Sequence, residues 1–332
     1  MSGMPKTDST NQSVGPAGAS AEAARGRLPI ARITQWPSED FTPITAERKL
    51  INAAATFGSD AAETLMSRAI FAFQRGQTGD SRGAVESLRD TLGMQEMKLG
   101  KESFDALATR NLLAHCVGQS GEFGRAALEY DALAIDCARV LGLDHPDTLS
   151  VRNNLAFWRG MAGNPQGATD AFATLLADRI RVLGPDDKET LATRESLAQW
   201  RGKSGDAQGA VQGYREVCPR SAKILGDLHP QTLTARNNLA HWLGESGKPK
   251  DAVALLVTVL ADRMTVLGAG HPDTLVTRNN LAHWRGLVFG ASVTVDELKA
   301  LAGDCLRLLG PNHPNTIAVW NNLDYWRSQL EG

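Results

Sequence analysis

The 332-residue sequence lacks the features that mark several large classes of protein. It has four cysteines and no C-x-x-C pair, so we expect neither a zinc site nor a dense disulfide framework. This cysteine usage fits a reducing compartment, and we expect a cytoplasmic protein. The longest nearly apolar run, AVALLVTVLA at 252–261, is about half of a membrane span, and the N-terminus lacks the apolar stretch of a signal peptide.

An excess of charge of one sign is also missing. The chain has 35 lysines and arginines against 37 aspartates and glutamates, a formal net charge of −2 at pH 7. Because there is no basic excess, we expect neither nucleic acid nor a membrane surface as a partner. No glycine-rich phosphate loop, nucleophile elbow or pair of catalytic carboxylates interrupts the sequence. We therefore expect no enzyme activity, no catalytic residues and no cofactor.

What the sequence does contain is a period of 42 residues. Arginine, glycine and leucine or isoleucine each return at this interval through most of the chain. The arginine column comprises Arg68, Arg110, Arg152, Arg194, Arg236 and Arg278, with Trp320 at the seventh place. Because three residue types keep one register, the pattern indicates a repeat architecture.

Each repeat has the pattern of two helices, which we name the A helix and the B helix. The A helix starts at a motif such as HPDTL at 271–275, with proline suited to the first helical position and aspartate to the positive end of the helix dipole. A glycine-containing turn, such as AGNPQG at 162–167, ends it. Neither helix can bury its apolar stripe alone, so neighbours must stack into an all-α solenoid.

The register divides the chain into four parts. These are an N-terminal disordered or linker segment at 1–43, a capping helix at 44–57, six repeat units at 58–309 and a C-terminal capping helix at 310–332. The sixth unit departs from the pattern at LVFGASVTVDEL, residues 287–298. Here we expect Thr294 and Glu297 to form a capping box at the start of the B helix.

The repeats resemble a known family. HPDTLSVRNNLAFWRGMAGN at 145–164 is similar to the 42-residue tetratricopeptide repeat (TPR) of kinesin light chains and to actinobacterial TPR proteins. The resemblance covers residues 58–329 and implies a TPR-type α-solenoid, a right-handed superhelix of antiparallel helix pairs. The second unit departs from it with KESFDALATRNLLAHC, the fourth with DDKETLATRESLAQW, and the kinesin pattern lacks the repeated tryptophan and arginine. We therefore carry over no motor-binding role.

Paired asparagines recur in the A helices, although asparagine is a poor residue for a helix interior. In families like this one, asparagine of the A helix holds the backbone of an extended peptide in a concave groove. By this resemblance, the first asparagine of each pair and the residue four positions later form the groove. The expected positions are Asn111, His115, Asn153, Phe157, Asn237, His241, Asn279, His283, Asn321 and Tyr325. Alternatively, these amides only satisfy the backbone or neighbouring helices, the role we expect for the second asparagine.

The remaining columns favour packing over ligand binding. The repeated tryptophans lie on an apolar stripe at helical spacing, which is typical of a core. The glycines late in the A helices are explained most simply by close helix packing. The arginine column faces Asp136, Asp178, Asp262 and Asp304, which favours interhelical salt bridges over an anion-binding strip. The histidines of the H-P-D motifs lie in different units, too far apart to share a metal ion.

The sequence therefore predicts a non-enzymatic scaffold that holds an extended segment of a protein or peptide partner. Two alternatives are a regulator that binds a signalling peptide and changes conformation, and a structural module for self-association. The segment ITQWPSEDF at 33–41 has a tryptophan near acidic residues. Ligands of kinesin light chain TPRs are similar in kind, so this segment is interpreted either as an internal pseudo-ligand or as a linker that covers the first capping helix.

Overall fold

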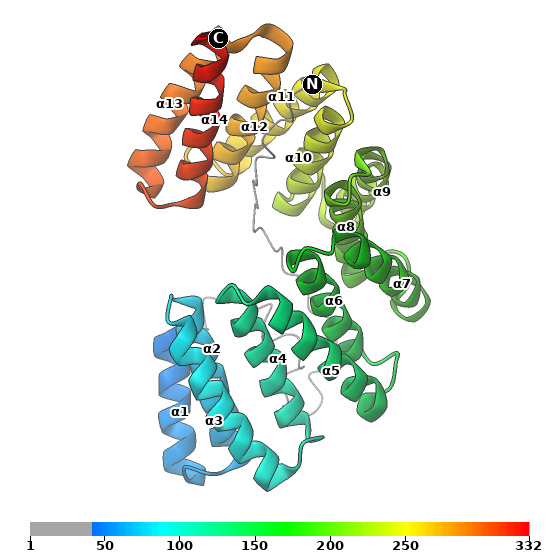
Figure 1. The fold of residues 1–332 in the computed structure, drawn as a ribbon, viewed down its shortest axis with the longest axis vertical. Coiled ribbons are helices and arrows are strands. Elements are labelled where there is room, and N and C mark those ends of the chain that lie inside the picture. The colour runs from blue at the N-terminus through cyan, green and yellow to red at the C-terminus, as the bar shows by residue number, and fades with distance from the viewer. Residues whose placement is uncertain (1–41, 332) are drawn as a thin grey trace. The chain divides into compact units, whose positions relative to one another are not determined.

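The computed structural model describes residues 42–331. Within this range the chain forms fourteen α-helices joined by short turns and contains no strand (Figure 1). The helices are α1 (Pro43–Phe57), α2 (Ala62–Gln77), α3 (Ser81–Leu99), α4 (Phe104–Gln119), α5 (Phe123–Leu141), α6 (Pro146–Met161), α7 (Pro165–Leu183), α8 (Lys188–Lys203), α9 (Ala207–Leu225), α10 (Pro230–Glu245), α11 (Pro249–Val266), α12 (Pro272–Phe289), α13 (Ala291–Leu309) and α14 (Pro314–Glu331). The even-numbered helices are the A helices, and the odd-numbered helices are the B helices.

The described residues form two compact units, an N-terminal unit at 42–200 and a C-terminal unit at 201–331. The boundary lies inside α8, a division that the 42-residue pattern does not predict. In each unit, helices that follow one another in the chain are antiparallel and packed together (Figure 1). The N-terminal unit thus runs from α1 to most of α8, and the C-terminal unit from the end of α8 to α14.

Four A helices begin at a histidine that acts as an N-cap. In α6, α10 and α12 the proline of the H-P motif occupies the first turn, as the sequence predicts. The histidine Nδ1 accepts the backbone N–H of the second residue after it, at 3.1 to 3.2 Å, and so satisfies a donor that the helix leaves free. The histidines are His145, His229, His271 and His313. This capping role was not predicted from the sequence.

The capping box expected at Thr294 and Glu297 is wrong. The helix α13 begins at Ala291, directly after Gly290, which ends α12 with a φ of 100°. Thr294 is therefore buried inside the helix, and Glu297 pairs with Arg285 of α12 at 2.8 Å. Because α12 is two residues longer than α10, the turn has shortened and the B helix starts earlier.

The tryptophan column forms the core, as predicted. Trp158, Trp200, Trp242, Trp284 and Trp326 are each only 4 to 7% exposed. Each ring lies against a glycine in the preceding A helix, and a Cβ atom at that glycine would overlap the ring. The pairs are Gly118 with Trp158, Gly160 with Trp200, Gly202 with Trp242, Gly244 with Trp284, and Gly286 with Trp326. The glycines are therefore required because tryptophan packs against the bare helix backbone.

The four cysteines are free and buried. Cys116 stands at the column position that tryptophan holds in later repeats, and its Sγ would lie 3.4 Å from a Cβ at Gly76. Burial raises the pKa of Cys116 and of Cys137 to about 12. These two thiols are therefore protonated packing groups and poor nucleophiles.

We predict that Trp242→Ala destabilises the C-terminal unit by about 3 to 5 kcal/mol, the usual cost of deleting a large core aromatic. Urea unfolding followed by circular dichroism measures this loss. Trp320→Ala is the control, because Trp320 stands on α14 outside this column and is only partly buried. We expect the control to lose less stability, and equal midpoints for Trp242→Ala and the wild type would contradict the packing role.

Candidate functional site

The A helices lie on the inner side of each unit. Successive A helices contact one another, as α2 does with α4 and α12 with α14. Successive B helices make no contact of that extent within the part of the chain that the structure describes. The helix pairs therefore converge on the A side, where solenoids present their concave binding surfaces.

Asparagines connect successive A helices through amide hydrogen bonds. Each bond runs from the Nδ2 of the second asparagine of one repeat to the Oδ1 of the first asparagine of the repeat before it. The three bonds are Asn154 to Asn111 at 3.2 Å, Asn280 to Asn237 at 3.3 Å, and Asn322 to Asn279 at 3.0 Å. We call these contacts the asparagine ladder. They confirm the structural role expected for the second asparagine.

The first asparagines differ in their exposure. Asn111, Asn237 and Asn279 are buried, with 0, 2 and 6% of their surface exposed. Asn153 is half-buried, and Asn321, on the last A helix, is exposed. The three buried amides bond to neighbouring A helices, as expected if these asparagines have a structural role and do not bind a ligand. Contact between this column and a ligand stays a prediction, and Asn153 and Asn321 are the positions that solvent reaches most easily.

The residues four positions after the first asparagines form a column of rings that rests on the tryptophans. His115, Phe157, His241, His283 and Tyr325 are all half-buried. Each makes an edge-to-face contact with a tryptophan, at centroid distances of 4.8 to 5.8 Å. Phe73 continues the column on α2 and packs on His115 at 5.7 Å. We call these six residues the ring column, and the structure brings its members together within each unit.

Burial keeps the three histidines of the ring column uncharged. Desolvation lowers the pKa of His115, His241 and His283 to about 4, and for His241 the neighbouring His283 contributes as well. At neutral pH each is a neutral imidazole with one donor and one acceptor nitrogen. Glu195 replaces the first asparagine in the fourth repeat, and burial raises its pKa to about 7.

A further column, which the sequence analysis missed, lies one helical turn beyond the rings. Gln77 and Gln119 are exposed, and their side-chain amides bond each other between α2 and α4 at 2.8 and 3.2 Å. Later members are Met161, Lys203, Glu245, Leu287 and Gln329. The spacing of four residues from the ring column is the sequence signal that could have found them. We call this set the last-turn column and name the side of the A helices that carries both columns the A-helix face.

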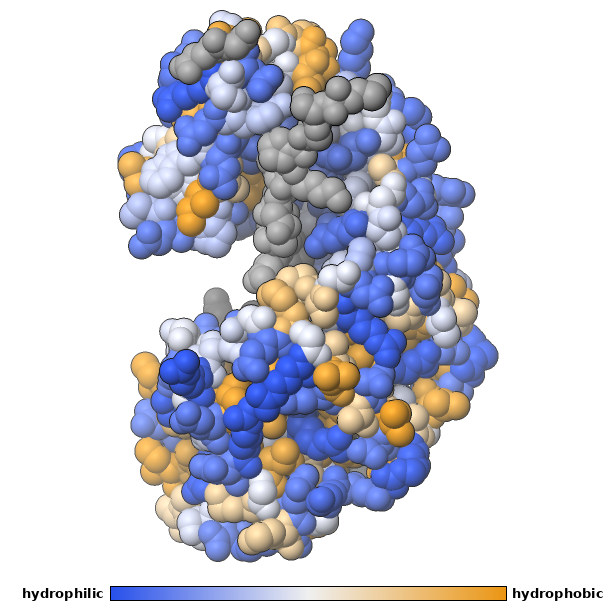
Figure 2. All heavy atoms as spheres, in the orientation of Figure 1, coloured by the Kyte–Doolittle hydropathy of each residue, from blue (hydrophilic) through white to orange (hydrophobic). Residues whose placement is uncertain are grey.

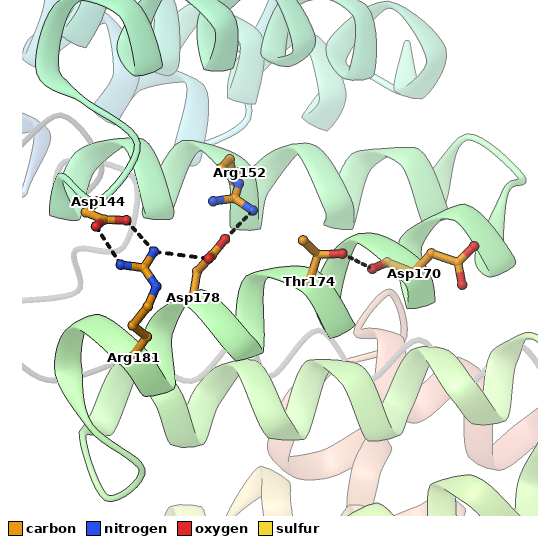
Figure 3. A network of polar contacts seen from close by, with 6 residues as sticks. All are labelled: Asp144, Arg152, Asp170, Thr174, Asp178 and Arg181. Atoms are coloured by element: carbon orange, nitrogen blue, oxygen red, sulfur yellow. Dashed lines mark hydrogen bonds and ion pairs between the residues drawn. The ribbon is translucent and has the colours of Figure 1, made fainter.

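The arginine column points to the B helices, which confirms the salt bridges expected from the sequence. Arg152 of α6 contacts Asp178 of α7 at 2.8 Å, and Asp178 also contacts Arg181, which bonds both carboxylate oxygens of Asp144 at 2.6 Å (Figure 3). Equivalent pairs are Arg110 with Asp136 at 2.7 Å and Arg278 with Asp304 at 2.8 Å. Their hydrogen bonds from arginine lower the pKa of the Asp136 and Asp304 carboxyl groups.

The part of the chain that the structure describes contains neither a metal-binding cluster nor a membrane-spanning helix. No group of three or more histidine, cysteine, aspartate or glutamate side chains is arranged to hold a metal ion. Nor does any helix between residues 42 and 331 combine the length and the apolar character needed to cross a membrane. On the face shown in Figure 2, exposed hydrophobic residues are scattered among hydrophilic ones.

Comparisons with known proteins agree with the repeated pairs of antiparallel helices. A tetratricopeptide repeat family model matches residues 148–187 and 232–273, and no curated protein matches the sequence. The chain is similar to the crystal structure of nearly identical TPR-like repeats from a candidate kinesin light chain of Podosopora anserina. The two are 26% identical, the match covers 62% of this chain and 98% of that one, and the TM-score is 0.57.

Two more distant crystal structures share the fold. BtubC (BKLC) from P. vanneervenii is 18% identical, with a TM-score of 0.57 and coverage of 70% of this chain and 94% of that one. The apo form of RapI is 10% identical, with a TM-score of 0.52, and the match covers 87% of this chain and 93% of that one. At these identities the similarity establishes the all-α solenoid fold alone.

The asparagine ladder predicts unequal effects of two matched substitutions. Asn279→Ala leaves the buried Nδ2 of Asn322 without its acceptor, and we expect a loss of about 1 to 3 kcal/mol in the free energy of unfolding. Asn153→Ala, at the half-buried equivalent, should cost less than about 1 kcal/mol. Urea unfolding compares them, and equal losses would contradict a structural role for the ladder.

The ring column predicts a pH dependence of stability. Because the folded pKa of His283 lies below its ordinary value, the unfolded chain binds a proton between pH 6.5 and 4 that the folded chain does not. Stability should therefore fall as the pH drops through this window. We predict that His283→Phe loses less stability than the wild type between pH 7 and pH 4.5.

Phenylalanine is a suitable replacement, because Phe157 occupies the equivalent position in α6. The opposite contribution of Glu195, whose raised pKa lowers stability as the pH rises from 4.5 to 7, is common to both proteins and cancels in the comparison. Chemical unfolding at several pH values measures the difference. Parallel pH curves for variant and wild type would argue against a buried neutral histidine.

Proposed function

Since the chain is a tetratricopeptide repeat protein whose repeats are similar to those of kinesin light chains, we propose that it is a non-enzymatic scaffold for protein partners. In this proposal, an extended segment of the partner lies along the A-helix face of one unit. The observation that carries the proposal is the ring column, a row of aromatic and imidazole rings on the inner side of each unit that are half-buried except for the buried Phe73. In the free protein, part of the apolar surface of these rings stays exposed to water. A bound segment would cover that surface, which favours binding.

The rings are held rigidly, which favours binding. Phe157 contacts both Trp158 and Trp200, at centroid distances of 5.0 and 6.2 Å. His283 likewise contacts both Trp284 and Trp326, at 4.9 and 5.8 Å. Rings that are already fixed lose little side-chain entropy when a ligand covers them. Large, fixed aromatic groups of this kind are frequent hot spots of protein interfaces.

Amides beside the rings supply groups that can pair with a peptide backbone. Asn153 and Asn321 flank the ring column, and Gln77, Gln119 and Gln329 lie beyond it. A primary amide both donates and accepts, so it can bind a peptide N–H or C=O whatever the side chain of that peptide residue. In this proposal Asn111, Asn237 and Asn279 do not contact the ligand. Their ladder bonds fix the distance between successive A helices, and so the spacing of the groups that bind the ligand.

The segment at 33–41, interpreted from the sequence as either a pseudo-ligand or a linker over the first capping helix, lies outside the described residues. Both roles stay predictions. A regulator that changes conformation on binding, and a module for self-association, remain the alternative functions. Changes in the radius of gyration on ligand binding, and sedimentation of the free protein, measure these two alternatives directly.

The proposal is tested with a displayed library of random dodecamer peptides and the full chain as bait. A selected peptide is then labelled and its affinity measured by fluorescence anisotropy for two matched variants. The face variant carries Gln119→Ala, Asn153→Ala, Asn321→Ala and Gln329→Ala. The control variant carries Gln166→Ala, Thr174→Ala, Gln208→Ala and Thr258→Ala, all exposed positions on B helices.

We expect the face variant to bind about tenfold more weakly or worse, because two lost hydrogen bonds at a typical value of about 1 kcal/mol each exceed the 1.4 kcal/mol of a tenfold change. The control should stay within about twofold of the wild type, since its positions lie away from the A-helix face. Equal affinities for both variants would remove the A-helix face as the binding site.

A further inference from the structure

Most arginines of the A helices are paired with carboxylates. In α4, α6, α10 and α12 every arginine contacts an aspartate or glutamate, and these four helices contain no lysine. In α2, Arg75 pairs with Asp80, whereas Arg68 contacts a methionine sulfur of α3 at 3.7 Å. The partners of the arginines in the other four helices lie on B helices or in the loop before an A helix. The pair of Arg152 with Asp178, seen in Figure 3, is an example. In these four helices, arginines that could attract an acidic ligand are therefore neutralised by the protein itself.

The A-helix face is nearly free of charge. Its ring column consists of phenylalanine, histidine and tyrosine, and desolvation holds the three histidines neutral at pH 7. In the last-turn column, Lys203 and Glu245 are the charged members between residues 77 and 329, and their charges are opposite. A face of this kind offers a ligand rings and amides, and no net positive charge.

Carboxylates stand in the first turn of several A helices, although α8 begins at the exposed Lys188. Asp147 stands seven residues before Asn154 and fourteen before Met161, so these three residues lie in line along α6. Equivalent first-turn positions carry Glu63, Asp105, Glu189 and Asp273. Asp147 is buried and Glu189 pairs with Arg179 at 3.3 Å, whereas Glu63 is exposed. A carboxylate on a bound segment would lose hydration on this face.

From this charge distribution we propose that the segment bound on the A-helix face is free of acidic residues and presents neutral aromatic or aliphatic side chains to the ring column. The inference rests on the function proposed above and specifies its ligand. It separates this protein from the ligand class implied by the kinesin light chain resemblance, a tryptophan set among acidic residues. It also makes the segment at 33–41, with Glu39 and Asp40, a poor occupant of the face.

The proposal is tested with three synthetic peptides derived from a sequence that the full chain selects from the random library. One peptide is neutral, and in the other two the same two positions carry aspartate or lysine. Affinities are measured at 50 and 500 mM NaCl. We expect the neutral peptide to bind best and to change by less than about twofold with salt, because screening affects only charged contacts.

A gain of function provides the matched variant. Gln77→Lys with Gln119→Lys places two cations on the exposed last-turn column beside the rings. We expect this variant to bind the aspartate peptide about threefold more tightly per added lysine, in a salt-dependent way. Gln166→Lys with Gln208→Lys, which adds the same charge to exposed B-helix positions, should leave that affinity unchanged.

The results of these binding experiments distinguish this inference from the proposed scaffold function on which it rests. Selection of acidic peptides by the wild type, or tighter binding of the aspartate peptide than of the neutral one, would overturn the inference and leave the scaffold function standing. Binding that weakens strongly with salt for the neutral peptide would do the same. If no peptide of any charge binds, the proposed function fails and this inference fails with it.

Discussion

The packing of a tryptophan ring on a glycine of the preceding A helix is the contact on which the other features depend. Because glycine has no side chain, the ring lies directly against the helix backbone, and two A helices approach closely. The ring-column residue precedes the tryptophan in the chain, so a fixed tryptophan also fixes its neighbour. Phe157 beside Trp158 and His283 beside Trp284 are held in this way. The same contact thus builds the core and orients the proposed binding surface.

Different types of polar residue occupy different sides of each A helix. Arginine pairs with carboxylates toward the B helix, asparagine joins one A helix to the next, and rings with glutamine occupy the side left to solvent. This division explains how a chain with 22% charged residues presents a nearly neutral A-helix face. Exposed ion pairs contribute little stability individually, whereas a buried amide pair is costly to break, so the ladder is the more specific of the two contacts.

Much of the fold could be predicted from the sequence, because the 42-residue period reports directly on repeated packing. The tryptophan core, the close-packed glycines and the arginine–aspartate pairs follow from residue type and spacing. The exposure of the first asparagines could not be predicted, since it depends on how far each A helix is rotated about its own axis. A rotation of one residue, about 100°, decides whether Asn237 or Asn238 of α10 faces a ligand.

The sequence also contains an alternation with a period of 84 residues, which is two repeats. Arg179 and Arg263 are 2% exposed, and each donates to a threonine fourteen residues later, Thr193 or Thr277, at 2.7 Å. In between, Ser221 occupies the equivalent position and Ala235 stands where the threonine would be. Buried arginine was not expected from composition, because arginine is almost never buried without partners. The partners become visible only when alternate repeats are compared.

The central claim is that the tryptophan ring requires the glycine it covers, and a double-mutant cycle on Gly244 and Trp284 tests it most directly. In a helix interior, Gly→Ala normally stabilises by up to about 1 kcal/mol. In the wild-type background, Gly244→Ala should instead destabilise, because the new methyl group would overlap the Trp284 ring. In the Trp284→Leu background, where the ring is gone, the same substitution should become neutral or stabilising. A Gly244→Ala effect of the same sign and size in both backgrounds, measured by urea unfolding, would contradict the account.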